Sequence, residues 1–177
     1  MIYASGYLEN EHDEILSLLE VLEELVARVE TDRDFSVDDI AAVTGYLKFF
    51  VDEFHFRKEE DFFYPAIVEA GIVGQSGPVG MLLEEHDRLR ELLDRVWSAV
   101  TGNRIEDDEF VKAAGSYITL LRAHIENENE LMFPIGDEKI SPSKHEKLIE
   151  EFKKFEKEIS VNKEIKKLRE RIDKLKA

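Results

Sequence analysis

Histidine and glutamate residues recur in this sequence at a spacing that suits metal coordination. In two places a histidine is followed by a glutamate four residues later and by a proline ten residues later. These two sets are His55, Glu59 and Pro65, and His124, Glu128 and Pro134. Positions i and i+4 lie on one face of an α-helix, so the two side chains of each His-x-x-x-Glu pair can reach one site together.

Two further histidines make this spacing part of an internal repeat. The tripeptide Glu-His-Asp occurs at residues 11–13 and again at residues 85–87, and in each copy two leucines lie six and seven residues after the histidine. The single histidines are 74 positions apart, and the His-x-x-x-Glu pairs are 69 positions apart. Each half therefore predicts two helices, the first with one histidine and the second with a histidine and a glutamate.

The surroundings of these residues predict that they face the core. Leucines recur around His12 and His86 at three- and four-residue steps, which places both imidazoles on an apolar face. Burying polar groups without partners is costly, whereas a metal ion would satisfy the imidazoles and neutralise the carboxylates. The candidate metal ligands are His12, His55, Glu59, His86, His124 and Glu128. The alternative is four core histidines that are hydrogen-bonded separately.

The number and type of these ligands restrict the metal. Four imidazoles and two carboxylates are too many for one tetrahedral zinc ion, but they suit two divalent ions bridged by the carboxylates, which points to iron. The chain has no cysteine, so thiolate sites, iron–sulfur clusters and cysteine nucleophiles are excluded. Phosphate-binding glycine loops and the common hydrolase motifs are also missing, so we assign no catalytic residue and no organic-cofactor site.

The amino-acid composition restricts the class to which the protein can belong. The 177 residues are 43% hydrophobic and 36% charged, which is typical of one soluble domain with a charged surface. The net charge is −16, and residues 161–177 carry +4 of their own, so we expect no nucleic-acid partner for the acidic body. No apolar run approaches the roughly 18 residues of a membrane span, and acidic residues interrupt the N-terminus. We expect a cytoplasmic protein with no membrane partner.

Helix-start and helix-stop signals divide the chain into helices. Ser36 with Asp39 resembles a capping box, and Pro78 suits the first turn of a helix. The predicted helices cover about residues 7–30, residues 36–65 with a continuation toward Gly71, Pro78 to a Gly102-Asn103 turn, and residues 107–133 before Pro134 and Gly136, with a fifth after Ser141 and Pro142. The fold class is all-α, an up-down-up-down four-helix bundle with an additional C-terminal helix.

The predicted domain organisation follows from these helices. Residues 1–140 would form the bundle with the metal site, and residues 141–177 would form an amphipathic C-terminal helix. Apolar residues continue at helical spacing through this C-terminal part. We expect the helix to pack on the bundle or on a partner chain, which would make a homodimer possible.

The ordered pattern His, His-x-x-x-Glu, His-Asp, His-x-x-x-Glu resembles that of the hemerythrins and their HHE cation-binding relatives. The resemblance covers residues of about 7–135 and extends loosely to about 158. It implies a hemerythrin-like four-helix bundle with an oxo- or hydroxo-bridged di-iron centre, for which zinc or manganese could substitute. It also implies that His12 and His55 hold one iron, that His86 and His124 hold the other, and that Glu59 and Glu128 bridge the pair.

The resemblance implies a function as well. With two histidines per iron, two shared carboxylates and a bridging oxygen, each iron would count five ligands and keep a position open for dioxygen, nitric oxide or peroxide. We therefore favour a metal- and oxygen-binding protein for sensing, storage or transport over an enzyme. The alternatives are a di-iron enzyme that reduces peroxide or oxygen or repairs iron centres, and an iron-sensing interaction module. Oxygen-carrying hemerythrins have a further histidine four residues after the third histidine, and this chain has Arg90 there.

Several residues near the predicted ligands have secondary expectations. Glu9 and Asp52 could add a ligand or could be solvated. We expect the charge of Arg90 to lie at the bundle edge or to pair with an acidic neighbour such as Glu59 or Asp94. Asp13 and Asp87, one residue after a ligand histidine, should face solvent, and His145 should lie at the surface. The predicted apolar walls of the metal site are Phe62, Phe63, Leu131 and Met132.

Overall fold

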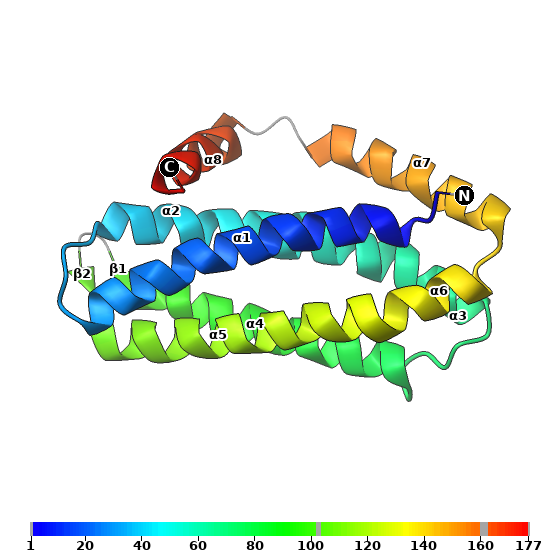
Figure 1. Cartoon of the computed structure of the whole chain (residues 1–177), viewed down its shortest axis with the longest axis horizontal. Helices are drawn as coiled ribbons and strands as arrows, with labels where there is room; N and C mark the ends of the chain where they lie inside the picture. The colour runs from blue at the N-terminus through cyan, green and yellow to red at the C-terminus, as the bar shows by residue number, and fades with distance from the viewer. Residues whose placement is uncertain (1, 102–103, 160–162, 177) are drawn as a thin grey trace.

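Four long helical segments form an antiparallel bundle in the computed structural model, which describes residues 2–101, 104–159 and 163–176 (Figure 1). The first segment is α1 (Ser5–Glu30). The second runs through α2 (Val37–Leu47), the π-helical turns η1 (Lys48–Phe56) and η2 (Glu59–Phe63), and α3 (Tyr64–Glu69). The third is α4 (Pro78–Ala99), and the fourth runs through α5 (Asp107–Asn127), η3 (Glu128–Met132) and α6 (Phe133–Lys139). The predicted all-α bundle is confirmed.

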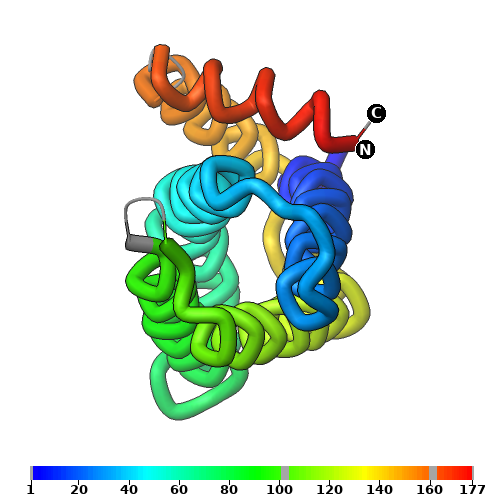
Figure 2. Tube along the Cα trace, turned by 90° about the vertical axis from the view of Figure 1, so that its left-hand side faces the viewer, coloured from blue at the N-terminus to red at the C-terminus, as the bar shows by residue number. Residues whose placement is uncertain are grey.

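Viewed end-on, the four segments occupy the corners of the bundle (Figure 2). Their apolar faces meet in two buried clusters, one at each end of the bundle. The predicted ligands lie between these clusters. On α1, for example, His12 lies between Leu8 of one cluster and Ile15 of the other. The bundle therefore buries a polar layer between two apolar layers.

A π-helical turn begins at the glutamate of each His-x-x-x-Glu pair. The turn η2 begins at Glu59 and η3 begins at Glu128, and each is followed by a proline in the first turn of the next α-helix. The prediction that Pro134 and Gly136 end the fourth segment is wrong, because the helix continues to Lys139. A proline is tolerated in a helix's first turn, where its missing N–H has no partner to lose.

The connections around α4 follow the predicted signals. The second segment ends just before Gly71, whose φ of 102° lies in the left-handed region that favours glycine. The helix α4 begins at Pro78 as predicted. Gly80 is required there, because a Cβ atom would collide with the carbonyl oxygen of Gln75. The predicted Gly102-Asn103 turn lies outside the described residues. Its flanking strands, β1 (Val100–Thr101) and β2 (Arg104–Ile105), pair antiparallel.

The C-terminal part of the chain forms two helices that lie on the outside of the bundle (Figure 1). The helix α7 (Pro142–Ile159) packs against η2, and α8 (Lys163–Leu175) packs against α2. The basic helix α8 contacts the acidic body through ion pairs of Arg171 with Asp39 at 2.6 Å and of Arg169 with Glu14 at 3.1 Å. The C-terminal region therefore packs on the bundle of its own chain, and pairing with a second chain remains a prediction.

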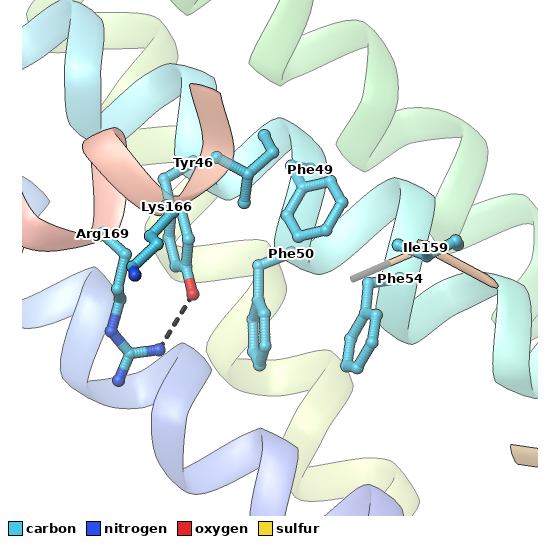
Figure 3. Close-up of a pocket in the computed structure, with 8 residues that line it drawn as sticks. Tyr46, Phe49, Phe50, Phe54, Ile159, Lys166 and Arg169 are labelled. Atoms are coloured by element: carbon cyan, nitrogen blue, oxygen red, sulfur yellow. Dashed lines mark hydrogen bonds between the residues drawn. The ribbon is translucent and has the colours of Figure 1, made fainter. Parts of the chain in front are cut away.

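A cavity of about 300 Å³ lies where the C-terminal helices meet the second segment (Figure 3). Aromatic rings form its floor, and two of them, Tyr46 and Phe50, stack with centroids 5.7 Å apart. The Arg169 guanidinium donates a hydrogen bond of 2.9 Å to the Tyr46 hydroxyl at one end. The lining residues are Tyr46, Phe49, Phe50, Phe54, Ile159, Ile165, Lys166 and Arg169. The cavity is therefore separate from the predicted ligands.

Across the described parts of the chain, no helix combines the length and the apolar character needed to span a bilayer.

Candidate metal centre

The structure brings all six predicted ligands together in the middle of the bundle. Each of them is at most 1% exposed to solvent. They form two overlapping groups, in which ligand atoms lie within 4.8 Å of one another and which share both glutamates. One group is His12, His55, Glu59 and Glu128, and the other is Glu59, His86, His124 and Glu128. The repeat seen in the sequence is thus an approximate two-fold symmetry in space.

The two histidine pairs have nearly the same geometry. The Nε2 atoms of His12 and His55 are 3.0 Å apart, and so are those of His86 and His124. The ring planes are inclined at 63° in the first pair and 64° in the second, with centroids 4.7 Å apart in both. Each half of the chain therefore supplies an equivalent pair of nitrogen donors.

The two carboxylates span these pairs. Glu59 places one oxygen 3.1 Å from His55 Nε2 and the other 3.4 Å from His86 Nε2. Glu128 Oε2 lies 3.3 Å from the Nε2 atoms of both His12 and His124. Each glutamate thus contacts one histidine from each half, which is the arrangement that a bridging carboxylate needs.

Hydrogen bonds on the outer side of each imidazole orient the ring. Each Nδ1 atom lies 2.7 to 2.9 Å from a side-chain oxygen, and an Nδ1–H group that donates there leaves the Nε2 lone pair facing the centre. The pairs are His12 with Asn129, His55 with Glu11, His86 with Glu60, and His124 with Glu85. The partners repeat with the ligands, since Glu11 and Glu85 each precede a ligand histidine and Glu60 and Asn129 each follow a ligand glutamate.

These atoms fit a pair of cations. Lone pairs of two Nε2 atoms at 3.0 Å would repel each other, and both Glu59 oxygens and Glu128 Oε2 are buried without a well-aligned hydrogen-bond donor. Two nitrogen ligands about 2.1 Å from one ion at a right angle would be about 3.0 Å apart. A cation in each group would therefore satisfy acceptors that the protein leaves unpaired.

The pKa values of these side chains show the same deficit of positive charge. Burial disfavours the imidazolium forms of His55 and His124, yet the neighbouring carboxylates outweigh it and raise each pKa to about 10. Burial likewise opposes ionisation of Glu128, but His124 and His12 hold its pKa well below the usual value. Protons on His55 and His124 can therefore supply positive charge to the buried carboxylates.

Aromatic rings cover the histidines and introduce one asymmetry. Phe133 stacks on His12 with a centroid distance of 5.3 Å, and Tyr64, the matching residue of the other half, stacks on His86 at 5.8 Å. The Tyr64 hydroxyl donates a hydrogen bond to Glu128 Oε1. Phe133 has no hydroxyl, so Glu59 receives no equivalent bond. Burial and the charges of Glu128 and Glu59 raise the Tyr64 pKa well above its usual value, which keeps the hydroxyl protonated.

The structure assigns other roles to the secondary candidates. Glu9 is exposed, as are Asp13 and Asp87, for which exposure was predicted. Asp52 accepts a 2.6 Å hydrogen bond from Arg90 instead of facing the centre. Arg90 also bonds Glu60 at 2.8 Å. The predicted pairing of Arg90 with an acidic neighbour is confirmed. The neighbours are not the examples expected, because Glu59 is buried at the centre and Asp94 pairs with Lys48 at 2.6 Å.

Two of the four predicted wall residues point away from the centre. Phe63 and Met132 are buried, whereas Phe62 packs against Phe152 of α7 and Leu131 is 56% exposed. The predictions for Phe62 and Leu131 assumed α-helical geometry. A π-helical turn contains more residues than an α-helical turn. The third residue after each glutamate therefore lies away from the side of the helix on which the glutamate lies, whereas the fourth residue lies close to that side.

Sequence reasoning missed several residues around the site. These are the hydrogen-bond partners of the imidazoles, Glu11, Glu60, Glu85 and Asn129, together with Tyr64, which bonds Glu128, and Lys58, which bonds Glu11. The internal repeat could have indicated Glu11 and Glu85, because both stand beside a ligand histidine in the repeated tripeptide. His145 was also predicted wrongly. It is buried, and its Nδ1 accepts a hydrogen bond of 3.1 Å from the Ala4 N–H.

Comparison with known families agrees with this geometry. Residues 4–135 match the family model described as the hemerythrin HHE cation binding domain. The match covers most of the chain and all six candidate ligands. The chain therefore belongs to the hemerythrin HHE cation-binding family, and the predicted family is confirmed.

Individual relatives are more distant. An uncharacterized protein of Mycobacterium tuberculosis is 24% identical over 131 residues, which is 72% of this chain and 51% of the relative. The iron–sulfur cluster repair protein YtfE of Musicola paradisiaca is 30% identical over 142 residues, which is 75% of this chain and 62% of the relative. The chain thus spans about half to three-fifths of the length of these curated relatives. No solved structure gives a significant match.

Proposed function

We propose that this chain is a hemerythrin-like non-haem di-iron protein that binds a small ligand, dioxygen or nitric oxide, for sensing, storage or transport. In this proposal His12 and His55 hold one iron and His86 and His124 hold the other. Glu59 and Glu128 bridge the two ions. The observation that carries the proposal is the convergence of four Nε2 atoms on two carboxylates that are shared between the two groups.

Iron suits this donor set better than the other common metals. Mixed imidazole and carboxylate ligands are typical of non-haem iron, and the absence of cysteine removes the thiolates that structural zinc sites often use. When bound, a di-iron centre supplies redox chemistry and an open position for a small ligand. The name of the YtfE relative, an iron–sulfur cluster repair protein, also supports iron.

The protein's own residues would shape what the centre can bind. Glu11, Glu60, Glu85 and Asn129 hold the imidazoles in the orientation that metal binding requires. The rings of Phe56, Tyr64 and Phe133 stack on the histidines and exclude water. A small diatomic molecule suits such an apolar surrounding, and the Tyr64 hydroxyl supplies a fixed donor to Glu128.

The second candidate function is a di-iron enzyme for repair of iron centres or reduction of peroxide. Its support is the similarity to YtfE over 142 residues. The match covers only 62% of that relative, so part of the relative's activity can reside in the portion that is not matched. This chain also contains no cysteine. We therefore rank ligand binding first.

Metal analysis and optical spectroscopy test the proposal. Protein loaded with iron under anaerobic conditions should hold two irons per chain, and its absorption spectrum should change when air or nitric oxide is added. Recovery of the starting spectrum after removal of the gas would support binding, whereas sustained consumption of peroxide would favour the enzyme. One zinc ion per chain with no capacity for a second ion would contradict a di-iron centre.

A further inference from the structure

The internal repeat extends to the outer surface of the bundle, where the two halves differ in what covers them. In the first half, α7 lies across the surface formed by α1 and η2 (Figure 1). In the second half, the matching surface between α4 and η3 is a groove of about 170 Å³. We call this groove the open face. It is lined by Pro78, Met81, Leu82, Glu85, Asn127, Leu131 and Met132.

Residues of the open face correspond to residues that α7 covers. With the offsets of the repeat, Met81 corresponds to Tyr7 and Leu131 corresponds to Phe62. A lysine of α7 lies 5.6 Å from the Tyr7 ring, and the Phe62 ring packs edge-on against Phe152 of α7 at 6.1 Å. Met81 is 66% exposed and Leu131 is 56% exposed. Both side chains line the same groove, and contiguous exposed apolar surface rimmed by polar groups marks interaction sites, unlike single exposed apolar residues.

A buried lysine in the first half has no counterpart in the second. Lys58 is completely buried and donates hydrogen bonds to Glu11 and to Glu156 of α7, the latter at 2.6 Å. The corresponding position in the second half is Asn127, which is exposed. Glu85 corresponds to Glu11. Lys58 therefore attaches α7 to the carboxylate that orients His55, and the second half lacks this connection.

The charge of the open face is unbalanced as a result. Glu85 bonds His124, its side chain is 23% exposed, and no lysine or arginine pairs with it among the described residues. Apart from the buried Glu128, the segments 78–85 and 127–132 contain three glutamates and no basic residue. A partner that covers this face would have to supply the cation that Lys58 supplies in the first half, because a buried unpaired carboxylate is costly.

We propose that the open face binds an amphipathic helix of a partner protein in the position that α7 occupies on the first half. The partner helix would lay apolar or aromatic side chains over Met81 and Leu131 and would place a lysine or arginine beside Glu85. Because Glu85 orients His124, the bound helix would place a positive charge one carboxylate away from the candidate metal centre. The docking itself does not depend on which metal the centre holds.

A peptide based on α7 is a direct probe of this proposal. A labelled peptide of residues 142–159 carrying Glu156→Lys places a cation where the proposal requires one, and the unchanged peptide places a glutamate there. In a fluorescence anisotropy titration, the full-length metal-loaded protein should bind the Glu156→Lys peptide saturably. The unchanged peptide should bind about ten-fold more weakly, because its glutamate would meet Glu85.

Variants of the full-length protein locate the binding surface. Leu131→Glu and Met81→Glu should each weaken binding of the Glu156→Lys peptide by about ten-fold or more. Leu175→Glu is the matched control, since it adds the same charge at an exposed apolar residue of α8 and should leave binding unchanged. Thermal unfolding should show that all three variants remain folded.

Three outcomes would overturn the proposal. The first is the absence of saturable binding by the Glu156→Lys peptide. The second is binding that Leu131→Glu and Met81→Glu do not weaken, which would place the peptide elsewhere. The third is self-association of the unmodified protein that Leu131→Glu abolishes in sedimentation experiments, since the occupant of the open face would then be a second copy of the chain.

Discussion

At the scale of single residues, the candidate centre depends on an ordered set of hydrogen bonds around each imidazole. Carboxylate or amide oxygens contact the Nδ1 atom of each candidate ligand histidine. The Nε2 atoms face Glu59 and Glu128, and three of the four oxygens of these two carboxylates lack a well-aligned donor. The unpaired acceptors are the physical reason for expecting cations. The two glutamates differ in one respect, since only Glu128 receives a hydrogen bond from a tyrosine.

The bridging role that we propose for the glutamates predicts how their loss would affect iron content. Glu59→Ala and Glu128→Ala should each lower bound iron from two ions per chain to fewer than one, because each carboxylate contacts a histidine from both halves. Plasma mass spectrometry of the purified variants measures this directly. Glu9→Ala, which changes an exposed glutamate, is the control and should retain both ions. Clean loss of a single ion would show terminal ligation.

The asymmetry at Tyr64 makes a separate prediction. Tyr64→Phe should lower the free energy of unfolding by about 1–3 kcal/mol, because Glu128 Oε1 would be left buried without its donor. Denaturant unfolding of the metal-loaded variant and parent measures the difference. Ser98→Ala removes another hydroxyl at an exposed position and should change stability much less. Equal stability of Tyr64→Phe and the parent would mean that the hydroxyl contributes nothing net.

At the scale of secondary-structure elements, the π-helical turns and α7 decide what surrounds the centre. The turns η2 and η3 begin at the two ligand glutamates and set which following residues face inward. The helix α7 is attached through two different ion pairs. Glu156 pairs with the buried Lys58 at 2.6 Å, and Lys144 pairs with Glu69 at 2.8 Å at the surface.

These two ion pairs predict unequal effects on stability. Lys58→Met should destabilise the protein by about 3 kcal/mol, because it leaves Glu11 and Glu156 without their shared buried cation. Lys144→Met should cost less than about 1 kcal/mol, because exposed ion pairs contribute little. Chemical denaturation compares the two. Hydrogen exchange in α7 should rise in Lys58→Met, and equal effects of the two variants would contradict a special role for Lys58.

At the scale of the whole molecule, the bundle is two similar helix pairs that enclose a polar layer between two apolar clusters. The C-terminal helices break the symmetry, because α7 covers one half only and α8 carries its basic residues to the acidic body. Metal binding should couple to the stability of this whole arrangement, since the unfolded chain has no preformed site.

The metal-free protein should therefore have a stability that depends on pH. His55 and His124 have folded-state pKa values of about 10 against an ordinary value of 6.5, so their protonation stabilises the folded state fully below pH 6.5. This contribution is lost as the pH rises toward 10. Thermal melts of chelated protein should show a falling midpoint over this range, and metal-loaded protein should be more stable throughout. Equal midpoints for both forms at every pH would contradict metal binding at this layer.

The sequence by itself determined the fold class, the family and the grouping of the six candidate ligands. Helical periodicity places residues i and i+4 on one face whatever their surroundings, and a repeat of that pattern predicts a paired site in a bundle. The same reasoning failed at Phe62 and Leu131, because the π turns changed the local periodicity. It failed at the end of the fourth segment because Pro134 lies in the first turn of α6, where a proline is tolerated.

Only the tertiary structure decided which carboxylates orient the imidazoles and what covers each half. Glu11 reaches His55 across 44 positions of sequence, and Lys58 reaches Glu156 across 98. His145 is buried because the N-terminus meets α7 at that point, which no local pattern indicates. Such contacts join separate helices, so they depend on how the helices are packed and not on the spacing within any one of them.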